Sequence, residues 1–230
     1  MLNVQVLTVF PELFPGFLGY SLTGKALNDG IWSIKSINIR DYAFDKHGSV
    51  DDTPCGGGAG MIMRPDVLGA AIKANYHGGK LIYMSPRGTP LTQQKVHELS
   101  KEENLTIICA RFEGVDQRVL DAYDVEEISI GDYILTGGEQ AAQIMLDAII
   151  RLLPDVLGNK DSLSDESFES YLLEYPQYTR PAVWNNMEVP EVLMSGHHKN
   201  IEQWRKQKAI EVTQNRRPEL LKKYLDSQKV

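Results

Sequence analysis

The stretch Glu126–Pro154 reads EEISIGDYILTGGEQAAQIMLDAIIRLLP and joins a short apolar run, a glycine loop and a periodic apolar segment. The run Glu126–Ile130 has the length of a buried β-strand. After the loop, apolar side chains recur at steps of three and four residues, at Ala142, Met145, Leu146, Ile149, Leu152 and Leu153. This spacing is typical of a helix with one buried face, and Pro154 is expected to end it. The stretch therefore predicts a strand, a loop and a long helix of an α/β fold.

The same alternation extends upstream. Apolar runs of strand length occur at Val4–Phe10, Trp32–Ile39, Leu81–Met84 and Leu105–Ala110. Helical spacing occurs between them, at Asp66–Ala74 and at Thr92–Glu103, where Thr92 is a candidate N-cap. Strands that alternate with helices indicate a mostly parallel sheet covered by helices on both faces.

The composition changes after Pro154. The segment 158–170, GNKDSLSDESFES, is polar and acidic and is typical of a linker. Beyond it, Asn200–Val212 and Pro218–Leu225 have the spacing of short amphipathic helices and carry many basic residues. We therefore expect an α/β domain over residues 1–158, an acidic linker over 159–170 and a small helical domain over 171–230.

The net charge of the chain is unevenly distributed. The chain has 24 Lys and Arg against 31 Asp and Glu, a formal charge of −7. From Gln177 onward there are 10 basic and 6 acidic residues, a net of +4, so the preceding 176 residues carry −11. A basic end on an acidic body is what a protein would use to contact a polyanion with that end only. A solvated helix face is the alternative explanation.

Several classes of protein do not fit this sequence. Hydrophobic residues make up 42% and charged residues 24%, as in folded globular proteins. No apolar run approaches the roughly 18 residues of a membrane helix, and Pro11 and Glu12 interrupt the start, which is atypical of a signal peptide. The two cysteines, Cys55 and Cys109, are too few for a disulfide framework. We expect a cytosolic protein.

Glycine-rich loops are the candidate ligand-binding elements. The cluster CGGGAG at 55–60 follows Asp51-Asp52-Thr53-Pro54 rather than a strand, so a dinucleotide fingerprint is not supported. The loops SPRG (85–88), RFEG (111–114) and LTGG (135–138) each follow an apolar strand. Ligands of open α/β sheets bind beyond the carboxyl ends of strands, so together these loops indicate a cofactor crevice. Each loop taken singly is also compatible with an ordinary turn.

Other common chemistries lack their motifs. The Walker pattern GxxxxGK[ST] and the GxSxG nucleophile elbow are both absent. The five histidines, at 47, 77, 97, 197 and 198, show no metal-ligand spacing with cysteines or carboxylates. No metal site is predicted from the residues.

Six motifs in order resemble those of the bacterial tRNA (guanine-N1)-methyltransferases of the SPOUT class. They are Val50-Asp51-Asp52 with GGGAGM, SPRG, RFEGVDQR, EISIGDYILTGGE, YPQYTRP, and LMSGHH with Trp204-Arg205. The resemblance implies a parallel-sheet domain with a C-terminal trefoil knot, and a homodimer whose active site is shared between subunits. It implies methyl transfer from S-adenosylmethionine to N1 of the tRNA guanine adjacent to the anticodon on its 3′ side, with Mg²⁺ as an associated ion.

Residue by residue, the resemblance also implies the sites. The methyl donor is expected against Tyr83, Ser85, Pro86, Gly88, Ala110, Ile130, Gly131, Asp132, Tyr133, Ile134, Leu135, Gly137 and Gly138. Arg180, Ser195, His197 and Arg205 are expected to face tRNA, and Glu113 lies as an acidic neighbour of the donor.

Methylation of N1 requires removal of its proton by a base, while negative charge develops toward O6. Arg151 matches the Arg that assists in the family. The family base is an Asp in a D-S-F motif, but here the motif reads Asp165-Glu166-Ser167-Phe168. Glu166 is the expected base and Asp165 is the alternative. The alternative is that both residues are merely solvated acids of the linker.

Further departures affect the expected donor site only modestly. Ala110, Phe112, Cys55, Gln117 and Arg87 stand where the family usually has Gly, Tyr, Tyr, Glu and Gln. The C-terminus is also shorter than is usual in the family. Two other functions remain open, namely another SPOUT methyltransferase acting on ribose or ribosomal RNA, and a non-catalytic RNA-binding module.

Overall fold

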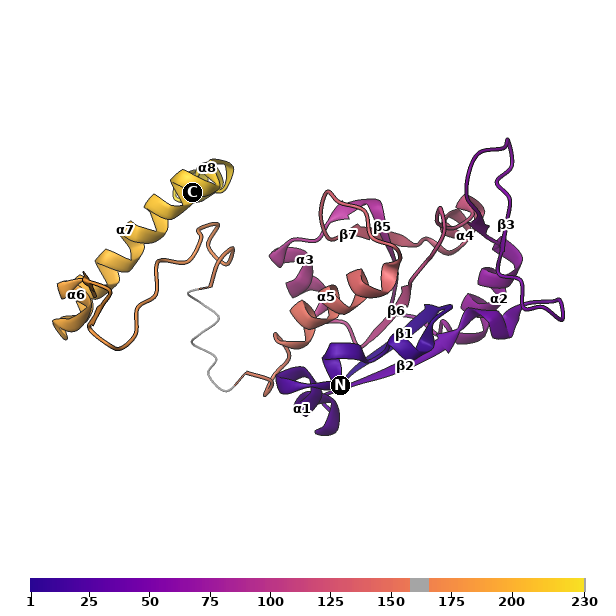
Figure 1. Ribbon diagram of the computed structural model, residues 1–230, viewed down its shortest axis with the longest axis horizontal. Coiled ribbons are helices and arrows are strands. Elements are labelled where there is room, and N and C mark those ends of the chain that lie inside the picture. The colour runs from indigo at the N-terminus through magenta and orange to yellow at the C-terminus, as the bar shows by residue number, and fades with distance from the viewer. Residues whose placement is uncertain (158–165, 230) are drawn as a thin grey trace. The chain divides into compact units, whose positions relative to one another are not determined.

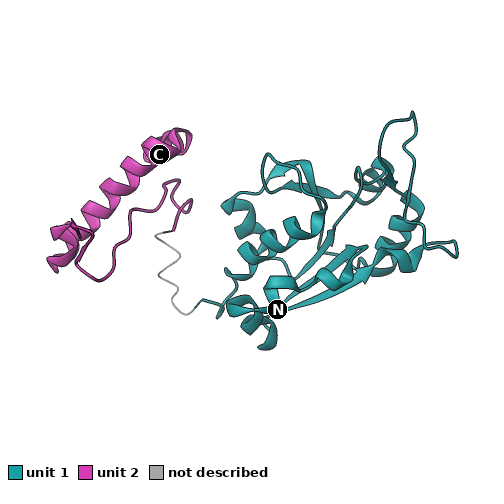
Figure 2. Ribbon diagram, in the orientation of Figure 1, with its two compact units in different colours: residues 1–158 teal, residues 159–230 magenta. Residues whose placement is uncertain are grey.

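The computed structural model describes residues 1–157 and 166–229. The chain divides into two compact units, residues 1–158 and residues 159–230 (Figure 2). Asp165, one of the two candidate bases, lies outside the described residues.

A parallel sheet forms the centre of the first unit (Figure 1). Among the described residues it has five strands in the order β2-β1-β6-β5-β7. Their bounds are β1 Leu2–Thr8, β2 Trp32–Asn38, β5 Lys80–Pro90, β6 Asn104–Ile108 and β7 Glu126–Ser129. The central strand β6 pairs with β1 through Val6 and Ile107, and with β5 through Ile82 and Ile107. The predicted parallel sheet is therefore confirmed.

Helices cover both faces of this sheet. One apolar cluster joins the strands to α1 Ser21–Asn28, α3 Gln93–Leu99 and α5 Gly138–Ile150. A second cluster joins the opposite faces of the same strands to α2 Pro65–Asn75 and α4 Gln117–Tyr123. Alternate strand residues enter different clusters; Ile82 belongs to the first and Tyr83 to the second. This period of two buries both faces, as expected of a parallel sheet.

Short elements complete the first unit. They are the 3₁₀ turns η1 Pro11–Leu13, η2 Gly16–Gly19 and η3 Ile39–Tyr42, and the two-stranded ladder of β3 Asp51–Asp52 with β4 Ile62–Met63. The sequence patterns do not predict α1 or α4. Helix α4 begins after Asp116, whose carboxylate accepts a hydrogen bond from the Arg118 amide at 3.0 Å. Thr92 caps α3 as predicted, by accepting from the Lys95 amide at 3.2 Å.

The long helix α5 ends earlier than its apolar spacing predicts. It stops at Ile150, and the amides of Leu152 and Leu153 donate to carbonyls three residues back, those of Ile149 and Ile150. The last turn therefore tightens toward 3₁₀ geometry before Pro154, which disfavours helical geometry at the residue before it. Leu153 is still buried against the first core cluster.

The second unit is built mainly from helices. Its described residues form the hairpin β8 Val183–Trp184 with β9 Met187–Glu188, then α6 Glu191–Met194, α7 His198–Arg216 and α8 Pro218–Ser227. A small core of Leu172, Ala209 and Tyr224 holds the entering segment against α7 and α8. Thr213 is fully buried and accepts from the Leu173 amide at 2.8 Å while donating to the Ala209 carbonyl at 2.7 Å.

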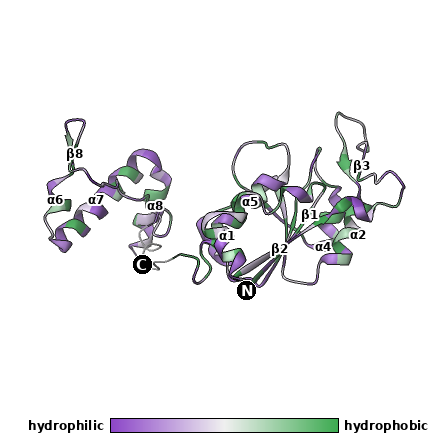
Figure 3. Cartoon of the chain, turned by 60° about the horizontal axis from the view of Figure 1, so that its bottom comes forward, coloured by the Kyte–Doolittle hydropathy of each residue, from purple (hydrophilic) through white to green (hydrophobic). Residues whose placement is uncertain are grey.

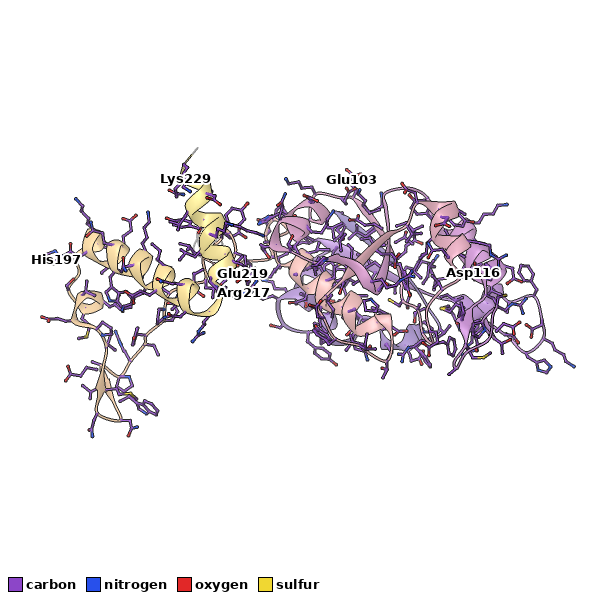
Figure 4. The ribbon with its side chains drawn as sticks, turned by 90° about the horizontal axis from the view of Figure 1, so that it is seen from above. Glu103, Asp116, His197, Arg217, Glu219 and Lys229 are labelled. Carbon is purple, nitrogen blue, oxygen red and sulfur yellow. The ribbon has the colours of Figure 1, made fainter. Side chains whose placement is uncertain are left out.

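Helix α7 is longer and more polar than the segment predicted at Asn200–Val212. It spans 19 residues and has largely hydrophilic side chains (Figure 3). His197 precedes its first residue, and the Arg217–Glu219 ion pair lies at its junction with α8 (Figure 4). No helix within the described residues is long and apolar enough to cross a membrane.

Candidate functional site

A cleft of about 230 Å³ opens beyond the carboxyl ends of β5, β6 and β7. These three strands are neighbours in the sheet, so the loops that follow them meet at one edge. The residues that line the cleft come from all three loops and from the start of α5; they are Tyr83–Pro86, Ala110–Gly114, Ile128–Gly131, Tyr133–Gly138 and Ala141. The crevice expected from the three glycine loops is therefore present.

The first wall depends on an irregular pairing of β5 with β7. Ile128 is the register partner of both Met84 and Thr89, so the four residues between them leave the ladder. Within this loop, the Arg87 amide donates to the Ser85 hydroxyl at 3.2 Å. Gly88 lies so close to β7 that a Cβ there would stand 2.4 Å from the Ile128 nitrogen. Only glycine fits this approach without movement of the backbone.

The opposite wall is the start of α5. The Gly138 amide donates to the Ala110 carbonyl at 3.0 Å, which holds the helix start against the end of β6. A Cβ on Gly138 would lie 3.0 Å from the Cys109 Cα. The glycine pair therefore lets the backbone of α5 approach β6 and places the positive end of the helix dipole at the cleft.

An ion pair joins the cleft-lining residue Arg111 to the buried Glu139. Glu139 is fully buried, and its Oε2 lies 3.0 Å from Arg111 Nε. Thr8 donates to the other carboxylate oxygen at 2.7 Å, and Arg111 Nη1 donates to the Thr136 carbonyl at 3.3 Å. The Arg111 guanidinium also lies over the Phe10 ring, 4.6 Å from its centroid. The pair thus joins the loop after β6 to the loop before α5.

Burial sets the protonation of two groups beside the cleft. Burial raises the pKa of the Tyr83 phenol, and the nearby Glu127 carboxylate raises it further. Burial also raises the pKa of the Cys109 thiol well above its usual value, with Glu139 adding to the effect. Both groups therefore stay neutral near pH 7, and Cys109 lacks the thiolate character of a nucleophile.

Most residues expected at the donor site line this cleft. Eleven of the thirteen do so, and Gly88 and Asp132 do not. Gly88 does not line the cleft, but its close approach to Ile128 sets the spacing of β5 and β7 in the wall. Glu113 also lines the cleft, and its side chain occupies the space that a Cβ on Gly60 would need. The sequence reasoning put Arg111 and Thr136 in the crevice loops but gave neither a role at the site; the position of Arg111 at the head of the RFEG loop was the available signal.

Comparisons with known proteins match nearly the whole chain. The family model of the tRNA (Guanine-1)-methyltransferase TrmD matches residues 2–223. The chain belongs to this family. It is 58% identical over 225 residues to the tRNA (guanine-N(1)-)-methyltransferase of Rhodospirillum rubrum, covering 97% of this chain and 94% of that protein. Proteins of the same name from Bartonella tribocorum and Wolbachia pipientis wMel are 57% and 55% identical, with coverage of 95–96% on both sides.

The expected catalytic residues of this TrmD-family chain fall in different units. Arg151 is the C-cap of α5, and its amide donates to the Asp147 carbonyl at 3.2 Å. Glu166 is the first described residue of the second unit and is half-buried. It lines a cleft of about 690 Å³ within that unit, together with His198, Arg205 and Lys206. The second unit therefore brings the candidate base and one predicted RNA-binding residue to the same cleft.

The remaining predicted RNA-binding residues of this TrmD-family member are exposed. Arg180 precedes the β8–β9 hairpin, and Ser195 and His197 lie between α6 and α7. The Ser195 hydroxyl accepts from the His197 amide at 3.2 Å and donates to the Val192 carbonyl at 2.8 Å. These bonds fix the SGHH turn at the start of α7.

Metal ligands do not gather in the part of the chain that the structure describes. No group of three or more His, Cys, Asp or Glu there is arranged to hold an ion. The acidic residue at the cleft, Glu113, has no second carboxylate among the cleft-lining residues. The described residues therefore do not fit a protein-built Mg²⁺ site.

Proposed function

We propose that the protein transfers a methyl group from S-adenosylmethionine to N1 of the guanine that follows the anticodon of tRNA on its 3′ side. The observation that carries this proposal is the cleft formed by the SPRG, RFEG and LTGG loops in a chain that belongs to the TrmD family. The alternatives of ribose methylation or RNA binding alone have no separate observation in their favour.

The cleft has the chemical character that the methyl donor requires. Apolar side chains of Ile130, Ile134 and Leu135 suit an adenine ring, and the backbone amides around Gly137 suit its polar edge. Tyr133, Ile134 and Leu135 are each more than 40% exposed, which leaves apolar surface for a ligand to cover. Bound there, S-adenosylmethionine would supply an electrophilic methyl group on a sulfonium.

The chain's own residues would then handle the proton and the charge of the guanine. Glu166, or Asp165 in its place, would accept the N1 proton, and such a base contributes about 10²–10⁴-fold to a rate. The Arg151 guanidinium would donate hydrogen bonds toward O6, where negative charge develops. Arg180, Ser195, His197 and Arg205 would hold the tRNA. Since the described residues do not fit a metal site, no step is assigned to Mg²⁺.

We also propose that the protein is a homodimer with a knotted donor-binding region. Exposed apolar side chains occur on η2, on α1 and on α5, at Phe17, Leu22 and Ile144, each about half exposed (51%, 49% and 46%). Gln143 of α5 donates to the Leu13 carbonyl at 2.8 Å, so the η1–η2 region and α5 are held together. Exposed apolar side chains on neighbouring elements favour a protein partner. Membership of the TrmD family is what supports the knot. A cytoplasmic location is part of the proposal, and the proposed tRNA substrate supports it.

One experiment tests the activity directly. The protein would be incubated with labelled S-adenosylmethionine and with two tRNA transcripts that carry G or A after the anticodon. We expect label only in the G transcript, at N1. Equal labelling of both transcripts would refute the assigned position, and label on ribose would favour the other SPOUT activity.

A further inference from the structure

The second unit contains another cleft, of about 460 Å³, whose lining includes two of the predicted RNA-binding residues, Arg180 and Arg205. The segment 175–180 forms one side, and residues from β9 to α7 form the other. Its volume lies in the range of about 300–1,000 Å³ that small-molecule sites occupy. Its occupant would be comparable in size to a small metabolite.

The cleft is positively charged and has no acidic lining residue. Its charged residues are Arg180 and Arg205, both exposed. Within residues 166–229, no carboxylate pairs with either guanidinium, whereas Lys208, Arg217 and Lys229 each pair with an acid. Two unneutralised arginines facing one cleft favour an anionic ligand.

Aromatic and apolar groups form the rest of the wall. Tyr178 is 48% exposed, and its ring contacts Trp204 at a centroid distance of 6.1 Å with the planes inclined by 61°. The Arg205 guanidinium lies over the Tyr175 ring, 5.0 Å from its centroid. The apolar residues Val189, Leu193, Met194 and Ile201 line the remainder. These contacts fix the orientation of Tyr178 and of the guanidinium plane while leaving the tyrosine ring accessible.

We propose that this cleft binds one unpaired nucleotide of the tRNA, with its base against Tyr178 and its phosphates on Arg180 and Arg205. A ligand that is both flat and anionic matches a wall that is both aromatic and cationic, and unstacked bases are what proteins read in single-stranded RNA. The proposal rests on tRNA being the substrate. It adds a nucleotide site within the second unit to the donor cleft in the first.

The test uses the full-length protein and measures tRNA affinity by fluorescence anisotropy. The probes are a tRNA transcript with G after the anticodon and a series in which one unpaired nucleotide at a time is abasic. We expect Tyr178→Ala to weaken binding about tenfold and Tyr178→Phe to restore most of it, since the ring provides the stacking. One abasic position should weaken wild-type binding by a similar factor and should not weaken Tyr178→Ala further.

The cationic half of the site has its own readout. We expect Arg205→Gln to lower the slope of log Kd against log salt by about 1 and to remove the effect of the same abasic position. Lys223→Gln removes one charge of the same unit outside the cleft, and it should lower the slope while leaving the abasic effect intact. Donor affinity, measured by calorimetry, should be the same in all variants because the donor cleft lies in the other unit.

Several results would overturn the proposal. One is a Tyr178→Ala variant with wild-type tRNA affinity, and another is an abasic effect that adds fully to that of Tyr178→Ala. If Tyr178→Ala loses affinity for a poly-glutamate probe while its RNA affinity is unchanged, the cleft would be assigned to an acidic protein segment. If the wild-type protein methylates tRNA and the variants give these results, only the nucleotide site is refuted. A wild-type protein that methylates neither transcript refutes the proposed function itself.

Discussion

Arg111, in the wall of the candidate donor cleft, forms an ion pair with Glu139, with 3.0 Å between Nε and Oε2 and with Glu139 fully buried. Arg111 comes from the loop after β6, and Glu139 is the second residue of α5. The two residues therefore belong to different walls of the cleft, and their ion pair links these walls. The pair connects the positions of two loops that line the candidate donor cleft.

Glu139→Gln should destabilise the first unit and weaken donor binding together. It leaves the Arg111 charge without its partner, and loss of one partner of a buried pair costs about 3 kcal/mol. Urea denaturation would measure the free energy of unfolding, and calorimetry the donor affinity. Glu98→Gln is the matched control, because its pair with Lys95 is exposed and worth less than about 1 kcal/mol. Equal effects of the two substitutions would contradict a special role for Glu139.

Gly88→Ala should be strongly destabilising although it adds a single methyl group. The new Cβ would stand 2.4 Å from the Ile128 nitrogen, so one strand must move away from the other. Overpacking of this kind costs about 1–3 kcal/mol. Gly69→Ala is the control, since its Cβ would meet only the Tyr123 hydroxyl at 3.9 Å and the site is helical. That variant should gain about 0.5–1 kcal/mol, and thermal unfolding would show opposite shifts in Tm.

Ile144→Glu should separate the proposed homodimer into monomers. Ile144 is 46% exposed on α5, and a carboxylate there would be desolvated by a partner subunit. Sedimentation velocity would measure the mass of the species. Lys73→Glu, an exposed change on α2, should leave the dimer intact. A dimer that survives Ile144→Glu with unchanged affinity would place the interface elsewhere.

Glu166→Gln should reduce the methyl-transfer rate about 10²–10⁴-fold without changing donor affinity, because the amide cannot accept the N1 proton. Single-turnover kinetics would separate this step from binding. Asp165→Asn is the paired variant and should be mild. If the two effects are reversed, Asp165 is the base.

The two cysteines should differ in reactivity, and the difference should depend on folding. Cys55 is exposed, whereas Cys109 is buried with a raised thiol pKa. Iodoacetamide at pH 8 should label Cys55 rapidly and Cys109 only after unfolding. Since the folded state holds the Cys109 proton more tightly than the unfolded state, the free energy of unfolding should fall as pH rises above about 8.5. A Cys109→Ala variant should lack that part of the decline.

The sequence predicted regular elements better than their junctions. The apolar runs located the parallel strands, and the spacing from Ala142 located α5, because burial on one or two faces imposes a fixed period. The apolar spacing did not predict helix α4, because its seven residues expose most of their side chains and only Val119 and Leu120 are buried. The early end of α5 depends on the bonds of Leu152 and Leu153, which the apolar pattern does not encode.

The site was predictable to the level of its loops. The three glycine loops indicated a crevice because the ends of neighbouring parallel strands share one edge. The pairing of Arg111 with Glu139 was not predictable, since it depends on how closely α5 approaches β6. The choice between Glu166 and Asp165 came only from family resemblance, because linker acids have no local pattern that distinguishes a base from a solvated carboxylate.

The unneutralised Arg180 and Arg205 affect how an encounter with tRNA begins. The residues before Gln177 carry a net charge of −11 and those from Gln177 onward +4, so an approaching polyphosphate is repelled by the former and attracted by the latter. Collisions in the wrong orientation are therefore short-lived. The association rate should fall steeply with added salt, which screens this field over about 10 Å. The dissociation rate should change less if a base stacks on Tyr178 in the bound complex. The charge asymmetry thus favours encounters in which the residues from Gln177 onward meet the tRNA first, before any base is contacted.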